Sequence, residues 1–197
     1  MAFQLLQICK SVGRPFTNKS LNWLQGFVEE YSSFLPTGYP SYNQIIKHVN
    51  GLPLASDEQE AKKPFAIYFH CSGGNNRTGV LAAVLLYLLG VSRESIAYEY
   101  KLTEIGFEKA RYPMQQRLKA RILKVGAYGG DDSLITQEML DRMTSSRPEV
   151  ILAILDIIDN TYGGILKYTH EVLKLTDEDI AKFREVMTVE ASTYDQK

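Results

Sequence analysis

A cysteine and an arginine with five residues between them, Cys71 and Arg77, lie in a glycine-rich turn between an apolar run and an apolar helical pattern. Phosphate binding would explain both the residue types and the spacing. A loop of this length lets successive backbone N–H groups converge on an anion, in front of the N-terminus of the next helix. The planar guanidinium of Arg77 can hold two phosphate oxygens at once, which a lysine cannot do.

Cys71 would lie beneath the phosphorus atom as a nucleophile. The converging N–H groups, the helix N-terminus and Arg77 all favour the thiolate, so we expect its pKa to fall below the ordinary value of about 8.5. A thiolate in this position can form a covalent phospho-enzyme. Thr78 can donate its hydroxyl to the thiolate or cap the helix. Gly73 and Gly74 allow the backbone to approach the anion closely.

Each of these residues also has a purely structural interpretation. A single cysteine after an apolar strand is often a small buried hydrophobe, and a single arginine after a turn is often solvated. Here His70 directly before Cys71, the five-residue gap and the run Arg77–Gly79 occur together, between a strand pattern and a helix pattern. That context favours a phosphate-binding loop.

The elements around the loop indicate an α/β fold. The five apolar residues Phe65–Phe69 predict a buried strand, and Val80–Leu89 predicts a buried helix. We therefore expect a small, largely parallel sheet with a strand–phosphate loop–helix core, followed by a helix-rich C-terminal half. Further helices are predicted at 20–34, 41–49, 92–105, 114–125, 135–143, 150–158, 165–173 and 176–187, with a turn at 36–40.

Two local signals mark helix starts in the C-terminal half. Ser146 and Thr176 are each followed three residues later by an acidic residue, the capping-box pattern. The length of 197 residues suits one domain. We expect it to comprise a helical N-terminal segment and linker (1–63), the phosphate-loop core (64–126) and the C-terminal helices (127–197).

The segment His70–Gly79 resembles the signature loop of the protein tyrosine phosphatase superfamily. The closer resemblance is to the tyrosine/lipid phosphatase-like family of fungi and bacteria, and it covers residues 41–187. In that family the loop precedes an apolar helix ending in Leu-Gly and several further helical motifs. The matching segments here are Leu89–Gly90, Ile96–Tyr100, Leu102–Glu104 and Pro148–Val186.

The resemblance implies a cysteine phosphatase fold and hydrolysis of phosphate monoesters. Cys71 would be the nucleophile, Arg77 would bind phosphate and stabilise the transition state, and His70 would orient the loop. The phosphate cradle would be formed by the N–H groups of the remaining loop residues, Ser72, Gly73, Gly74, Asn75, Asn76 and Thr78.

Two features differ from that family. Its loops usually carry Lys-Asp before the arginine, where this chain has Asn75 and Asn76. The lysine serves members that handle several phosphates, and the aspartate can assist proton transfer. The family's N-terminal strands and Asp-Leu-Arg element also have no match, which predicts a chain truncated relative to the family or an altered sheet. Asp57, in an acidic linker before Cys71, is a possible general acid.

Composition narrows the kinds of partner. The net charge is −1, which gives no general attraction to nucleic acid. The two cysteines, Cys9 and Cys71, are too few for a disulfide scaffold. No apolar run is long enough for a membrane span or a signal peptide, so we expect a cytoplasmic protein. No His, Cys, Asp or Glu spacing is typical of a metal site, so we expect no metal and no other cofactor.

The sequence therefore predicts a protein tyrosine phosphatase-like hydrolase that acts on phosphorylated proteins or small phosphomonoesters. One alternative is a catalytically impaired pseudophosphatase that binds phosphoproteins, and another is a phosphoinositide phosphatase. A basic cluster after the loop either attracts an anionic substrate or forms a solvated helix face. Its members are Arg117, Lys119, Arg121 and Lys124.

Overall fold

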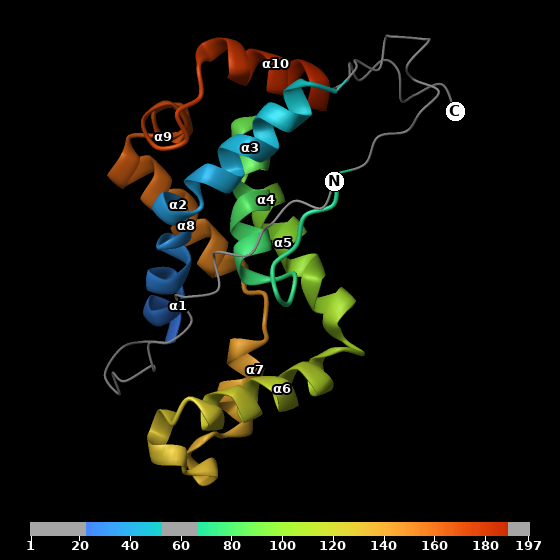
Figure 1. Ribbon diagram of the computed structural model, residues 1–197, viewed down its shortest axis with the longest axis vertical. Coiled ribbons are helices and arrows are strands. Elements are labelled where there is room, and N and C mark those ends of the chain that lie inside the picture. The colour runs from blue at the N-terminus through green and yellow to red at the C-terminus, as the bar shows by residue number, and fades with distance from the viewer. Residues whose placement is uncertain (1–22, 53–66, 189–197) are drawn as a thin grey trace.

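The computed structural model describes residues 23–52 and 67–188. These residues fold into α-helices and two 3-10 turns, η2 and η3, arranged as in Figure 1. In chain order they are α1 (Trp23–Ser32), α2 (Phe34–Thr37), α3 (Tyr39–Asn50), α4 (Asn76–Leu88), α5 (Arg93–Phe107), α6 (Arg111–Lys124), η2 (Ala127–Gly130), η3 (Asp132–Leu134), α7 (Gln137–Met143), α8 (Pro148–Tyr162), α9 (Ile165–Glu171) and α10 (Asp177–Met187).

The prediction of an α/β fold with a small parallel sheet is wrong, because none of the described residues forms a strand. The predicted strand at 65–69 begins outside the described ranges, and its remaining residues, 67–69, form no strand. Ile67 and Phe69 pack against the core while Tyr68 is exposed, which is the alternation of an extended chain. A sheet needs neighbouring strands, and the neighbours here are helices.

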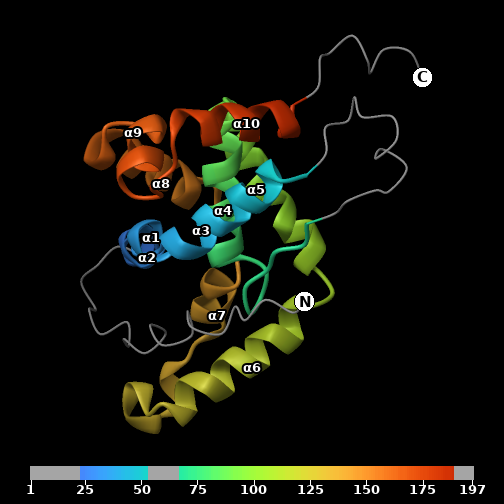
Figure 2. The same ribbon diagram turned by 45° about the horizontal axis from the view of Figure 1, so that its top comes forward.

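Helix α4 lies at the centre of the body, as predicted from its apolar sequence. It contacts α1, α2, α5, α8 and α9, and Figures 1 and 2 show these helices surrounding it. A helix that is apolar on nearly all sides is stable only when other elements cover every side. Its fully buried residues include Val80, Val84 and Leu88. The loop that precedes α4 is therefore held by the most buried helix of the body.

Helices α6 and α7 form an arm that projects from this body (Figure 1). They pack against each other, and the turns η2 and η3 join them at the far end of the arm. In both views the trace of residues 67–75 lies between the arm and the body (Figures 1 and 2). The predicted phosphate loop thus lies where these two parts of the structure meet.

The turn predicted at 36–40 is shorter than expected, because α2 ends at Thr37 and α3 begins at Tyr39, so that only Gly38 forms the turn between them. Pro36 lies in the first turn of α2 and Pro40 in the first turn of α3, where a missing N–H removes no intrahelical hydrogen bond. A Cβ on Gly38 would lie 2.6 Å from the ring of Tyr42, so a side chain there would displace that ring. The tight connection carries Tyr42 toward the centre of the body.

One predicted capping box is confirmed and the other is wrong. Thr176 caps α10: its Oγ1 accepts the Asp179 N–H at 3.1 Å, and Asp179 accepts the Thr176 N–H at 3.0 Å. The N-cap of α8 is instead Arg147, with no side-chain cap, so the Ser146 hydroxyl is used elsewhere. In the described parts of the chain, no helix is both long and apolar enough to cross a bilayer.

Candidate functional site

The predicted phosphate loop is a tight turn that leads directly into α4. Residues 71–75 have no regular structure, and α4 begins at Asn76, so Arg77 and Thr78 lie in its first turn. Gly74 has a φ of 72°, a left-handed conformation that a residue with a Cβ rarely adopts. The α4 N-terminus, whose first N–H groups have no partner within the helix, is therefore at the end of the loop.

The Cys71 thiol interacts with the far side of the loop. Burial alone would raise the pKa of Cys71. Three hydrogen bonds act against burial: one from the Thr78 hydroxyl and two from the N–H groups of Thr78 and Gly73. With the positive charge of Arg77 they outweigh the effect of burial and lower the pKa of Cys71 from 9.0 to about 7. Thr78 Oγ1 also accepts the Cys71 N–H at 2.8 Å, which closes the loop.

His70 is exposed, but its ring is fixed at the entrance of the loop. Its Nδ1 lies 2.8 Å from the Cys71 carbonyl oxygen. Its ring packs against the exposed ring of Tyr68, with centroids 5.1 Å apart. The His70 ring is thus held against the peptide group that joins Cys71 to Ser72, and its role in orienting the loop stays a prediction.

Three buried tyrosines from separate helices lie close enough to Cys71 to interact with its charge: Tyr31 of α1, Tyr42 of α3 and Tyr100 of α5. Burial raises the pKa of each, and the nearby Cys71 adds to the rise. The Tyr31 and Tyr100 hydroxyl oxygens are 3.1 Å apart. A Cβ on Gly79 would lie 2.4 Å from the Tyr100 ring, so only glycine allows α4 to approach α5 so closely.

Glu30 of α1 is a carboxyl group near the loop that sequence reasoning missed. Burial raises its pKa, and the charge of Arg77 acts in the opposite direction. In the described part of the chain, no carboxylate lies within ion-pair distance of Arg77, so its guanidinium has donors available for an anion. Glu30 could not be found from the sequence because the α1–α4 contact is long-range.

Asn75, predicted as part of the cradle, turns its side chain away from solvent. The side chain is 4% exposed, and its Oδ1 accepts a hydrogen bond of 2.9 Å from the Ser146 hydroxyl. Ser72 and Gly73 of the same loop are exposed. Met114 of the arm lies beside Gly73, with its sulfur 3.5 Å from the position of a Cβ there.

The basic cluster lies on α6. Lys119 forms an ion pair with Asp132, while the other three members, Arg117, Arg121 and Lys124, are exposed. The predicted general acid, Asp57, lies outside the described residues. Within the described ranges, no group of three or more His, Cys, Asp or Glu side chains could hold a metal ion.

Comparison with known proteins agrees with the resemblance inferred from the loop. The profile of the tyrosine phosphatase family matches residues 10–189, which is most of the chain. This chain therefore belongs to the tyrosine phosphatase family. A tyrosine-protein phosphatase of Nostoc commune is 29% identical over 75 residues, a match that covers 38% of this chain and 22% of that protein. The chain thus matches under a quarter of that relative's length.

Proposed function

We propose that this protein hydrolyses phosphate monoesters, with phosphotyrosine as the preferred substrate, through a phosphate covalently bound to Cys71. The supporting observation is the environment of the thiol. Its pKa of about 7 leaves about half of Cys71 as thiolate at pH 7, compared with about 1% for a thiol of pKa 9.0. A buried structural cysteine has no need of this stabilisation, whereas a nucleophile does.

The proposed reaction has two displacement steps. The Cys71 thiolate attacks phosphorus, an S–P bond forms, and the ester P–O bond breaks as the phenolate leaves with its electron pair and takes up a proton. Water then attacks the cysteinyl phosphate, loses a proton to the surrounding solvent, and the S–P bond breaks to release phosphate and thiolate. Arg77 and the loop N–H groups hold the equatorial oxygens in both steps.

The rival function is a phosphoprotein-binding module without turnover. One observation favours it: Asn76 takes the place of the acid that family loops usually carry, and it is not a proton donor of the required strength. Such a module would bind the phosphate in the same loop and leave the ester intact.

Hydrolysis of nitrophenyl phosphate separates the two functions. We expect turnover by the wild type and by Cys9→Ser, and a loss of at least about 10³-fold in Cys71→Ser, because the hydroxyl is not ionised at neutral pH. Equal rates in wild type and Cys71→Ser would contradict the proposed function. Phosphate binding without any turnover of the wild type would favour the binding module.

A further inference from the structure

A cluster of buried polar side chains joins the phosphate loop to the α6–α7 arm. Five polar side chains in the described ranges are buried, and four of them belong to this cluster. They are Asn75 of the loop, Gln115 of α6, and Thr144 and Ser146 of the segment between α7 and α8. Burying polar groups is costly unless they are hydrogen-bonded, so this concentration beside one loop needs a physical explanation.

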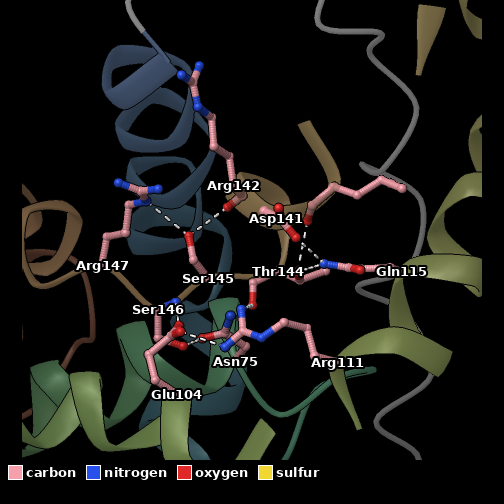
Figure 3. Close-up of polar contacts among 11 residues, drawn as sticks. Asn75, Glu104, Arg111, Gln115, Asp141, Arg142, Thr144, Ser145, Ser146 and Arg147 are labelled. Atoms are coloured by element: carbon pink, nitrogen blue, oxygen red, sulfur yellow. Dashed lines mark hydrogen bonds and ion pairs between the residues drawn. The ribbon is translucent and has the colours of Figure 1, made fainter. Parts of the chain in front are cut away.

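Ser146 is the residue of the cluster that contacts the loop (Figure 3). Its sequence pattern predicts a helix cap, yet its hydroxyl donates to Asn75, which is 71 positions away in the chain. The Ser146 side chain also acts to lower the pKa of Tyr100, so it lies close to that hydroxyl. Ser146 therefore holds the loop through Asn75 and does not cap α8.

Glu104 of α5 fixes Ser146 from the other side. One of its carboxylate oxygens accepts the Ser146 N–H, and the other accepts Arg111 Nη2 of the arm at 2.5 Å. Arg111 Nη1 donates to the Thr144 carbonyl at 3.1 Å. Figure 3 shows the Glu104 and Arg111 side chains meeting beside Ser146 and Asn75.

The rest of the cluster secures the arm. Gln115 donates from Nε2 to Asp141 at 2.8 Å and to Thr144 Oγ1 at 3.1 Å. Gln137 Nε2 donates to the side-chain Oε1 of Gln115 at 3.0 Å. A continuous series of hydrogen bonds therefore runs from α6 and α7 through Thr144, Arg111, Glu104 and Ser146 to Asn75 in the loop.

We propose that Ser146 and Glu104 are positioning residues, which hold the phosphate loop in its anion-binding conformation through Asn75 and make that conformation depend on the α6–α7 arm. This inference rests on the proposed function, in which the loop binds the reacting phosphate. Neither residue contacts the reacting atoms. Both act through the loop backbone, whose N–H groups must point at the sulfur and the phosphate together.

The proposal predicts a specific defect in Ser146→Ala. Without the serine hydroxyl, Asn75 Oδ1 is buried without a donor, so Asn75 must turn toward another partner and move the adjoining backbone. A displacement of about 1 Å in a catalytic group can reduce the rate by about 10²-fold. The loop N–H groups would also stabilise the thiolate less, so the pH midpoint of Cys71 alkylation should rise.

The test measures the alkylation rate of Cys71 against pH by peptide mass spectrometry, together with kcat and KM for nitrophenyl phosphate. Variants Ser146→Ala and Glu104→Gln should shift the alkylation midpoint upward and lower kcat, and Ser146→Thr, which keeps the hydroxyl, should restore both. The matched control is Ser145→Ala, because that neighbouring hydroxyl donates to the Arg142 carbonyl and does not contact the loop. It should behave as the wild type.

An unchanged midpoint in folded Ser146→Ala and Glu104→Gln would overturn the proposal, as would equal effects in Ser145→Ala. If Ser146→Ala does not fold, Glu104→Gln and Ser146→Thr still decide the question. Alkylation needs no turnover, so a shifted midpoint in a protein that hydrolyses nothing would support this inference and reject the proposed function. A normal rate of hydrolysis with no shift would do the reverse.

Discussion

Thr78 offers the sharpest perturbation of the thiol, because its hydroxyl contacts Cys71 twice. The hydroxyl donates to the sulfur, and its oxygen accepts the Cys71 N–H at 2.8 Å. Thr78→Val removes both bonds while keeping the shape and the β-branch of the side chain. The remaining N–H groups and Arg77 still favour the thiolate, so the variant measures what the Thr78 hydroxyl as a whole adds to the lowering of the pKa.

The expected size of the effect follows from the energy of one hydrogen bond. A hydrogen bond to a charged group contributes about 1.5–3 kcal/mol, and 1.36 kcal/mol corresponds to one pKa unit. Because Cys71 is only half-buried, we take the lower end, about one unit, so its pKa should rise from about 7 to about 8. At pH 6 the thiolate fraction then falls about tenfold, and above about pH 9 it hardly changes.

The assay is alkylation by iodoacetamide at a series of pH values, with Cys71 and Cys9 resolved as separate peptides. Thr78→Val should react about tenfold more slowly than wild type at pH 6 and at nearly the same rate above pH 9. Thr169→Val is the matched control, since this buried hydroxyl donates to helix carbonyls in α9, remote from the loop. Superimposable profiles for wild type and Thr78→Val would show that the Thr78 hydroxyl does not stabilise the thiolate.

Three further predictions test neighbouring parts of the account. Arg77→Lys should lower kcat/KM for an aryl phosphate by about 10²–10³-fold, because lysine cannot hydrogen-bond two phosphate oxygens at once. Arg121→Ala, on an exposed face of α6, should change kcat/KM little. Equal losses in the two variants would show that the basic cluster belongs to the site. Gly79→Ala should destabilise the fold by about 1–3 kcal/mol in urea titrations, because its Cβ would lie 2.4 Å from the Tyr100 ring, and wild-type stability would contradict that packing. Across aryl phosphates of graded leaving-group pKa, the rate should fall steeply in both wild type and Asp57→Asn; a flat wild-type series that becomes steep in the variant would identify Asp57 as the acid.

Sequence reasoning succeeded where the signal is local. The apolar run after the loop predicted the buried helix α4, and Thr176 with Asp179 predicted the capping box of α10. In each case the responsible residues are neighbours in the chain, so the pattern and the structure depend on the same contacts. Cys71, Arg77 and Thr78 lie within eight residues of one another, so the sequence alone could single them out as candidates, and their functional roles stay predictions.

The errors arise where distant parts of the chain decide the outcome. The apolar residues of 65–69 suit a strand, but a short apolar run does not specify whether its neighbours are strands or helices. Ser146 had the pattern of a cap, yet a long-range partner, Asn75, takes its hydroxyl. Glu30 and Tyr100 reach the loop only through helix packing, and no spacing in the sequence indicates this.

A phosphate covalently bound to Cys71 is the intermediate that distinguishes the proposed reaction from any mechanism without a cysteine nucleophile. Wild-type protein mixed with nitrophenyl phosphate would be quenched in denaturant within milliseconds and digested for peptide mass spectrometry. We expect phosphate on the Cys71 peptide, at a level that rises to a steady state as nitrophenol is released, and none on the Cys9 peptide. Steady turnover with Cys71 unmodified at every time, or with phosphate on a different residue, would contradict it.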